Sequence, residues 1–225
     1  MRHSTVRAFA GLLFLHLVLA ALLFIPAGTL AYWQAWLFLA VFGGSSLAIT
    51  LYLMKRDPAL LERRVHGGPT AEKRATQRII QTLTNVAFIS TLVVPAIDHR
   101  LGWSAIPLPA VLGGDVLIGL GFFLIFLVFR ENSFAAAIVD VFPGQKVVSS
   151  GPYAFVRHPM YTGALVMFVG IPPALGSWWG LLAVLAFLPA GRWRLLDEER
   201  FLAEALPGYS DYTERVRYRL LPGLW

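Results

Sequence analysis

The sequence contains no cysteine, so it can form no disulfide, no thiolate metal site and no cysteine nucleophile. Charged residues are scarce as well: they make up 14% of the 225 residues, whereas soluble domains carry roughly 25%. Hydrophobic residues reach 57%, and the mean hydropathy is +0.64. A soluble globule of this length cannot bury so much apolar surface, and a disordered chain would not contain it. The composition therefore predicts an integral membrane protein.

Four apolar runs are each close to the ~20 residues that an α-helix needs to cross the hydrocarbon core of a bilayer. We expect these transmembrane helices at about residues 8–26, 32–54, 79–97 and 111–129. The first run has the basic flank of a secretory signal, but it is longer than the roughly 7–15 apolar residues of a signal peptide and lacks a cleavage site. The third contains polar residues such as Gln81 and Asn85, which predicts a buried helix packed on the glycine-rich fourth.

The next apolar stretch, residues 159–190, is interrupted by Pro172-Pro173 and by Gly176-Ser177. Each half is short for an independent span, so we interpret the stretch as a broken helical hairpin that returns to its own side. The predicted fold is all-α, with four transmembrane helices plus the hairpin, or about five or six membrane helices in total. We expect residues 1–129 to form a membrane domain and residues 130–225 a catalytic region.

The Lys and Arg residues are distributed unevenly about these predicted spans. With four spans and a returning hairpin, Arg100 is the only one of the 19 on the far side. Because basic residues are retained in the cytoplasm, this predicts that both termini are cytoplasmic, and it explains the net charge of +6 without nucleic acid. We interpret the basic connector, residues 55–78, as a solvated loop that touches anionic lipid heads.

Polar residues concentrate where the hairpin begins, in the run Arg157-His158-Pro159-Met160-Tyr161. Proline favours the first turn of a helix and disfavours helix just before it, so a helix should start at Pro159. Free N–H groups at that start, flanked by Arg157 and His158, favour an anion. The alternative is an interfacial anchor, since Arg, His and Tyr are common at the headgroup level.

A second polar run, Arg192 to Leu206, follows the hairpin. On a helix, Glu198 falls on the same face as Arg194 and several apolar residues, and Glu199 on the neighbouring stripe. The alternative is an ordinary surface pair between Arg194 and Glu198. A returning hairpin brings both runs together at its mouth, where positive and negative groups would suit a zwitterionic cofactor.

The C-terminal half resembles the isoprenylcysteine carboxyl methyltransferase family, and related phospholipid N-methyltransferases carry a similar Glu-Glu element. The resemblance covers roughly residues 130–225, and the ending at residues 217–222 is similar to bacterial members. It rests on these motifs: Gly151-Pro152-Tyr153, Arg157-His158-Pro159-x-Tyr161-x-Gly163, Glu198-Glu199-x-x-Leu202 and Tyr209-x-x-Tyr212.

The resemblance implies that S-adenosylmethionine (SAM) binds at the mouth of the hairpin. Carried over position by position, it assigns the cofactor site to Gly144, Gln145, Lys146, Val147, Pro152, Tyr153, Arg157, His158, Pro159, Met160, Tyr161 and Glu198. Arg194 matches a substrate-contacting arginine. The eukaryotic enzymes have four consecutive acidic residues where this chain has Asp197-Glu198-Glu199, so which carboxylate contacts the cofactor stays open.

The predicted function is SAM-dependent methyl transfer to a carboxylate or amine of a lipid or lipid-like acceptor, in a bacterial inner membrane with the site facing the cytoplasm. We name Arg194, Arg157 and Glu199 as catalytic candidates: an arginine would hold a carboxylate, and Glu199 would be the base for an amine. No metal, nucleic acid or obligate protein partner is expected. The chain after Arg192 should be an ordered part of the site.

The acceptor should enter sideways from the bilayer, between the hairpin and the paired third and fourth spans. Two alternatives to the methyltransferase are an NADPH-dependent reductase of the sterol-reductase type and a non-enzymatic transporter or assembly subunit. The latter predicts ionisable residues at mid-membrane, where only Asp115 is a candidate.

Overall fold

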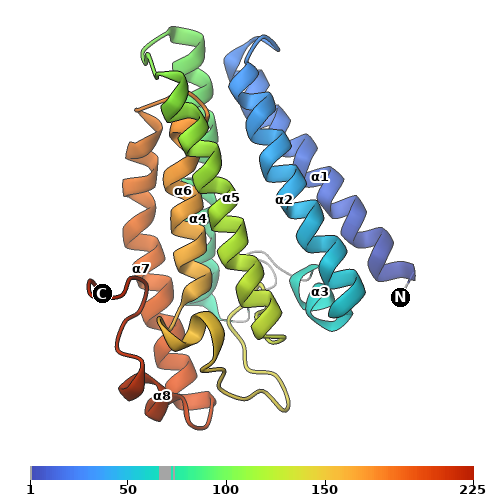
Figure 1. Cartoon of the computed structure of the whole chain (residues 1–225), viewed down its shortest axis with the longest axis vertical. Helices are drawn as coiled ribbons and strands as arrows, with labels where there is room; N and C mark the ends of the chain where they lie inside the picture. The colour runs from blue at the N-terminus through green and yellow to red at the C-terminus, as the bar shows by residue number, and fades with distance from the viewer. Residues whose placement is uncertain (1, 66–71, 73) are drawn as a thin grey trace.

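The structure is a computed structural model that describes residues 2–65, 72 and 74–225, without the side chains of residues 2–5. The described residues form helices joined by loops, with no strand (Figure 1). The helices are α1 (Arg2–Ala27), α2 (Trp33–Arg56), α3 (Pro58–Val65), α4 (Ala75–Leu101), α5 (Leu108–Glu131), α6 (Pro159–Ala174), α7 (Gly180–Ala205) and α8 (Tyr209–Arg215), with a short 3-10 helix at Gly151–Ala154.

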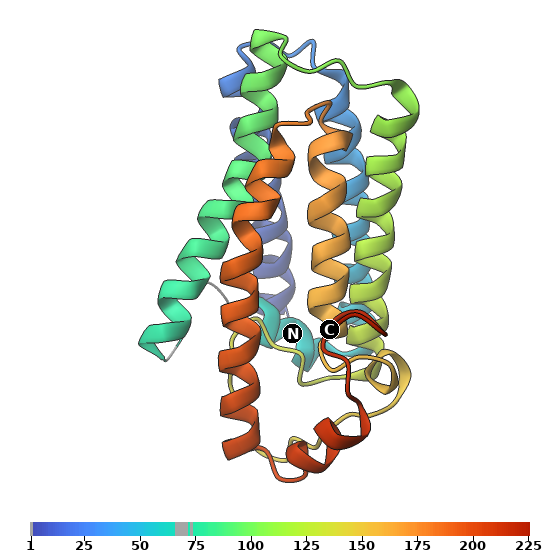
Figure 2. The same cartoon turned by 90° about the vertical axis from the view of Figure 1, so that its left-hand side faces the viewer.

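Four of these helices, α1, α2, α4 and α5, are long and apolar enough to cross a membrane. The prediction of an all-α fold with four such helices is therefore confirmed. Helices α6 and α7 run antiparallel and form the expected hairpin (Figure 2). Helix α7 passes through Pro189 without interruption, so the apolar second half of the hairpin and the polar run at residues 192–206 belong largely to one helix.

Helices α5 and α6 approach so closely that their backbones touch. A Cβ atom on Gly121 would lie 2.6 Å from the carbonyl oxygen of Gly163, and one on Gly170 would lie 2.6 Å from that of Gly114. On each helix the two glycines are seven residues apart, which places them on one stripe. Gly163 of the sequence motif therefore serves helix packing.

The expectation that the third span packs on the fourth is wrong. Helix α4 packs mainly against α7 and α1, and α5 uses its glycines on α6. The polar residues of α4 do not require that neighbour, because Ser90 and Thr91 bond carbonyl oxygens of their own helix at 2.9 and 2.7 Å.

The turn of the hairpin is fixed by the buried carboxylate of Asp98, near the end of α4. It accepts hydrogen bonds from the hydroxyls of Ser104 (2.6 Å) and Ser177 (2.5 Å) and from the backbone N–H of Ser104 (2.8 Å). The Tyr32 hydroxyl donates to the carbonyl oxygen of Leu175 at 2.5 Å. We call this cluster of Asp98, Ser104 and Ser177 the turn network.

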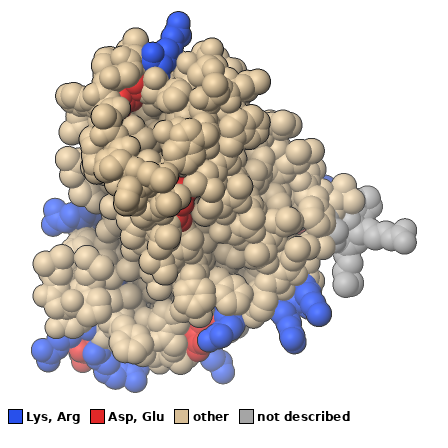
Figure 3. Space-filling model, turned by 45° about the horizontal axis from the view of Figure 1, so that its top comes forward, with Lys and Arg blue, Asp and Glu red and all other residues tan. Residues whose placement is uncertain are grey.

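Charged side chains gather at the opposite end, where the hairpin opens. In the space-filling view most of them lie along the lower edge, below a face that is largely free of charge (Figure 3). Both termini lie toward that end (Figure 1). The polar end of the molecule therefore coincides with the mouth of the hairpin.

Candidate functional site

Helix α6 begins at Pro159, as predicted, and the C-terminal tail lies along the residues just before it. The backbone N–H groups of Arg157 and His158 donate to the carbonyl oxygens of Tyr218 (2.9 Å) and Arg219 (3.0 Å). The Tyr212 hydroxyl of α8 donates to the carbonyl oxygen of Tyr153 at 2.8 Å. The tail is thus an ordered part of the hairpin mouth.

Three consecutive carboxylates of α7 face three different neighbours, since successive residues of a helix are about 100° apart. Asp197 accepts hydrogen bonds from Gln77 (2.5 Å) and Arg74 (2.9 Å), which join α7 to α4 and to the residue before it. Glu198 points toward α6, and Glu199 points toward the tail. The three carboxylates therefore connect α7 to three different parts of the molecule: α4, α6 and the C-terminal tail.

Glu199 fastens the tail to the hairpin. Its carboxylate oxygens accept hydrogen bonds from Arg157 (2.8 Å) and Arg219 (2.8 Å), and one lies 3.3 Å from Nε2 of His158. Burial alone would raise the pKa of the Glu199 carboxyl, but the bonds from His158 and Arg219 and the charge of Arg157 lower that pKa to about 2.

The guanidinium of Arg157 is also engaged by the tail. Its Nε and Nη2 atoms donate to the carbonyl oxygens of Val216 (2.9 Å) and Arg217 (2.7 Å), while Nη1 serves Glu199. All three guanidinium nitrogens therefore donate hydrogen bonds within the protein, and two of these bonds attach the tail to Arg157.

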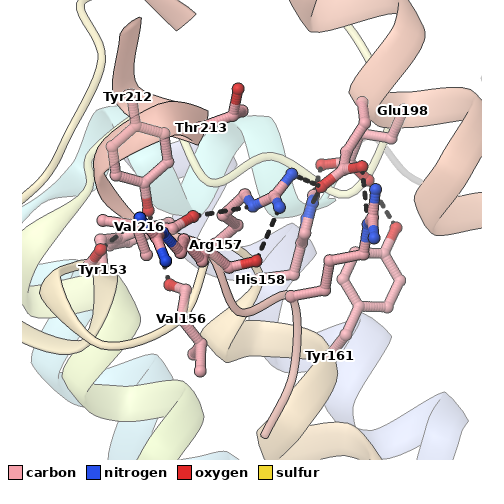
Figure 4. A network of polar contacts seen from close by, with 12 residues as sticks. Tyr153, Val156, Arg157, His158, Tyr161, Glu198, Tyr212, Thr213 and Val216 are labelled. Atoms are coloured by element: carbon pink, nitrogen blue, oxygen red, sulfur yellow. Dashed lines mark hydrogen bonds and ion pairs between the residues drawn. The ribbon is translucent and has the colours of Figure 1, made fainter. Parts of the chain in front are cut away.

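Glu198 belongs to a second, deeper network. The Tyr161 hydroxyl donates to Glu198 at 2.6 Å and accepts from Nε of Arg194 at 3.1 Å (Figure 4). Nη2 of Arg194 pairs with Glu72 at 2.9 Å, and the Glu72 side chain is 1% exposed. Nη1 of Arg194 is buried without a hydrogen-bond partner among the described residues. We call Glu72, Tyr161, Arg194 and Glu198 the mouth network.

A cavity of about 390 Å³ opens beside the mouth network. Arg157 and Arg194 line it, and so do most of the residues assigned to the cofactor: Gln145, Lys146, Val147, Tyr153, Arg157, His158, Pro159, Met160, Tyr161 and Glu198. Gly144, Pro152 and Glu199 are not among its lining residues. Tyr209 and Tyr212 also contribute to the wall.

Residues of the basic connector and of α4 also reach this cavity, which the sequence analysis missed. Arg64 of α3 and Gln81 of α4 line it, and Glu72 is 2% exposed beneath it. The interpretation of the connector, residues 55–78, as a solvated loop is therefore wrong for Arg64 and Glu72, and its residues 66–71 and 73 lie outside the described residues. A signal was present, because Leu60 and Leu61 give α3 an apolar side that is buried.

Comparison with known proteins finds a family match over the part of the chain that carries most of the site. Residues 109–207 match the family model described as phospholipid methyltransferase. The cobalt-zinc-cadmium resistance protein CzcN of Cupriavidus metallidurans is 30% identical over 103 residues, which cover 45% of this chain and 47% of that relative. The chain thus spans about half the length of that curated relative. The resemblance found in the motifs is confirmed for this region, whereas α3, Glu72, Gln81 and the Tyr209-x-x-Tyr212 motif lie outside residues 109–207.

Proposed function

We propose that this chain, which carries a phospholipid methyltransferase region from α5 to the loop after α7, is an integral-membrane SAM-dependent methyltransferase. Its acceptor is a carboxylate or amine of a lipid or lipid-like molecule. The observation that carries the proposal is the cavity at the hairpin mouth, where Tyr161, Arg194 and Glu198 meet at the ends of apolar helices. The distribution of Lys and Arg supports a cytoplasmic site in a bacterial inner membrane.

The cavity offers groups that match the parts of SAM. The Glu198 carboxylate accepts one hydrogen bond from Tyr161, and its remaining lone pairs can accept from an ammonium or a ribose hydroxyl. The rings of Tyr153, Tyr209 and Tyr212 offer apolar faces to an adenine. The hydroxyl of Tyr209 is buried without a partner among the described residues, so a polar atom of the ligand would satisfy it. Ligand sites of roughly 300–1,000 Å³ are usual, and this cavity falls in that range.

When bound, SAM supplies an already activated methyl group. The chain's own residues then need only orient the acceptor in line with it and exclude water. Arg194 is placed to hold an acceptor carboxylate, and Glu198 to orient the cofactor. A Glu199 carboxyl with a pKa of about 2 is a weak base, and its oxygens are engaged, which favours a carboxylate acceptor over an amine. Arg157 acts by positioning the tail.

The acceptor's chain has a separate place to lie. Between α4 and α7 runs an apolar groove of about 690 Å³, with Ala183, Ala186 and Ala190 on one side and Ala87 on the other. The groove reaches Leu83 and Trp193, while nearby Gln81 and Arg194 line the cavity. We place lateral entry here, rather than between a paired α4 and α5, because that pair does not exist. The proposed occupant is the acyl or prenyl chain of the acceptor.

Calorimetry on the purified protein in neutral detergent tests the proposal. SAM should bind, NADPH should not, and Glu198→Gln should weaken SAM binding about ten-fold or more, as expected for a lost charge-assisted hydrogen bond. Glu204→Gln, an exposed change on the same helix, is the matched control. Binding of NADPH in place of SAM would favour the reductase alternative, and binding of neither would reject an enzyme of either type.

The groove has its own test. Ala186→Trp should fill it and lower turnover of a long-chain acceptor while leaving SAM affinity unchanged. Leu185→Trp, an exposed neighbour outside the groove, is the control. Equal turnover of short and long acceptors at matched low concentrations would refute lateral entry, because each buried CH2 should contribute about 0.8 kcal/mol.

A further inference from the structure

Arg64 is fixed on the wall of the cavity by a short, well-anchored helix. The N–H of Leu60 donates to the Asp57 carboxylate at 2.9 Å, where α3 begins. Leu60 and Leu61 are buried in an apolar cluster with Val128 of α5. Arg64 follows one turn later, so its guanidinium is carried by a helix with both a cap and a core contact.

Within the described part of the chain, the groups that Arg64 contacts are uncharged. Its Nη1 atom donates to the carbonyl oxygen of Ala136 at 3.1 Å and lies 3.7 Å from the sulfur of Met160. Its guanidinium carbon lies 4.8 Å from the ring centre of Phe129. None of these groups neutralises its charge, whereas Arg157 pairs with Glu199 and Arg194 with Glu72.

A second cation stands near Arg64 on the same wall. Burial and, to a smaller extent, the positive charge of Arg194 together lower the pKa of Arg64 to about 10. Arg194 itself keeps a buried N–H without a partner among the described residues. Arg64 and Arg194 both line the cavity, and Arg64 has no carboxylate partner among the residues that the structure describes. The two guanidiniums therefore form a place where a ligand's anion would be stabilised.

The cavity has two different sides, and Arg64 belongs to the one nearer the membrane helices. Phe129, Ala135 and Met160 cluster there with Leu53 of α2. A second apolar cluster that also lines the cavity contains Val147, Leu206, Tyr209 and Tyr212. Two of the three proposed adenine contacts, Tyr209 and Tyr212, belong to this second cluster, whereas Tyr153 packs against the first. We therefore assign to the acceptor the part of the wall around Arg64, Ala135 and Met160.

We propose that Arg64, together with Arg194, binds the anionic head group of the methyl acceptor, and that α3 thereby sets the acceptor's charge preference. The anion is a carboxylate or a phosphate. The inference rests on the proposed function for the identity of the acceptor, and it adds a specificity residue from outside the family region.

Binding of single-chain amphiphiles to the full-length protein in neutral detergent tests this inference without requiring turnover. The probes are tetradecanoate, tetradecyl phosphate and uncharged tetradecanol. The wild type should prefer at least one anionic probe over tetradecanol, and Arg64→Gln should reduce that preference about ten-fold or more. Arg64→Lys should lose less, because it keeps the charge but not the planar fork. The better anionic probe identifies the head group as carboxylate or phosphate.

Arg56→Gln is the matched control, since it removes an exposed arginine from the end of α2. SAM affinity should stay within about two-fold in all these variants. If Arg64→Gln does not fold, Arg64→Lys carries the comparison. An unchanged anion preference, or a loss of SAM affinity with the preference intact, would overturn the proposal. Absence of SAM binding in the wild type would instead reject the proposed function, whatever the amphiphiles do.

Discussion

The two ends of the α6–α7 hairpin each hold a buried carboxylate cluster, but the clusters differ in how completely they are satisfied. In the turn network, Asp98 receives three donors from Ser104 and Ser177. In the mouth network, counting the described residues alone, one N–H group of Arg194 has no partner and Glu198 receives one hydrogen bond, beside a cavity.

This difference separates structural polar groups from binding groups. A buried carboxylate with enough donors stabilises one conformation and needs no ligand. Where a network borders a cavity and some of its donors and charges have no partner, a ligand that binds these groups stabilises the folded protein. The turn network therefore fixes the hairpin, and the mouth network is placed to bind.

Arg194→Gln should give the largest effect. It leaves Glu72 buried without its cation, and breaking a buried ion pair in this way costs about 3–5 kcal/mol of folding free energy. The double variant Glu72→Gln/Arg194→Gln should recover much of that stability, but it should not recover methyl transfer. Thermal unfolding in detergent and a turnover assay measure the two quantities. Equal losses in single and double variants would contradict the pairing.

The attachment of the tail should depend on pH through Glu199. Its pKa is lowered in the folded state to about 2 from 4.5, so its contribution is complete above about pH 4.5 and is lost as the pH falls toward 2. The contribution amounts to about 3 kcal/mol. Hydrogen exchange of residues 217–220, corrected for intrinsic rates, should rise over this range. Glu199→Gln should expose the tail at every pH, and exchange that is independent of pH in the wild type would contradict the assignment.

The close contact between α5 and α6, made by Gly114, Gly121, Gly163 and Gly170, runs from the turn of the hairpin to its mouth. Alanine variants at its two ends can distinguish effects on stability from effects on SAM binding. Gly114→Ala, near the turn, should cost about 1–3 kcal/mol by overpacking and leave SAM affinity unchanged. Gly121→Ala, nearer the mouth, should cost a similar amount and also weaken SAM binding, because it displaces α6. Gly119→Ala is the control, since its Cβ would meet no atom within 4 Å. Calorimetry and thermal unfolding give both readings.

Asp98→Ala should give the smallest effect, about 1–3 kcal/mol of stability, because it leaves the buried hydroxyl of Ser177 and two partly buried donors of Ser104 without their acceptor. SAM affinity should not change. Ser90→Ala, which removes a hydroxyl bonded within α4, is the control. A loss of SAM affinity in Asp98→Ala with unchanged stability would show that the two networks are not separate.

Local sequence features predicted the local structure well. Hydropathy located the long helices, and the His158-Pro159 pair located the start of α6, because both depend on a few neighbouring residues. The choice of helix neighbours depends on contacts between distant segments. The seven-residue spacing of glycines on both α5 and α6 was a usable signal for that pair, and polarity in α4 was a misleading one.

The candidate site was predicted by residue type at the ends of the hairpin, and most of those residues line the cavity. Arg64 and Glu72 were missed because basic connectors between spans are usually solvated. The buried Glu72 pairs with Arg194 of α7, more than a hundred positions away, and no local pattern indicates such a contact. The neighbours of Asp197, Glu198 and Glu199 could likewise not be predicted from the sequence, because they depend on how α7 is rotated about its own axis.

Because each residue of α7 is turned by about 100° from the one before it, the direction in which each carboxylate points depends on the number of residues that precede it in the helix. Deleting one residue between Ala190 and Asp197 would turn everything downstream by about 100° and shorten the helix by about 1.5 Å. Glu199 would then stand where Glu198 meets Tyr161, Glu198 would take the position of Asp197, and the tail would lose its anchor. A deletion that preserves all three carboxylates would thus reassign each of them. We expect related chains to vary in this segment by substitution, and to place insertions and deletions in the loops before Gly180 or after Ala205.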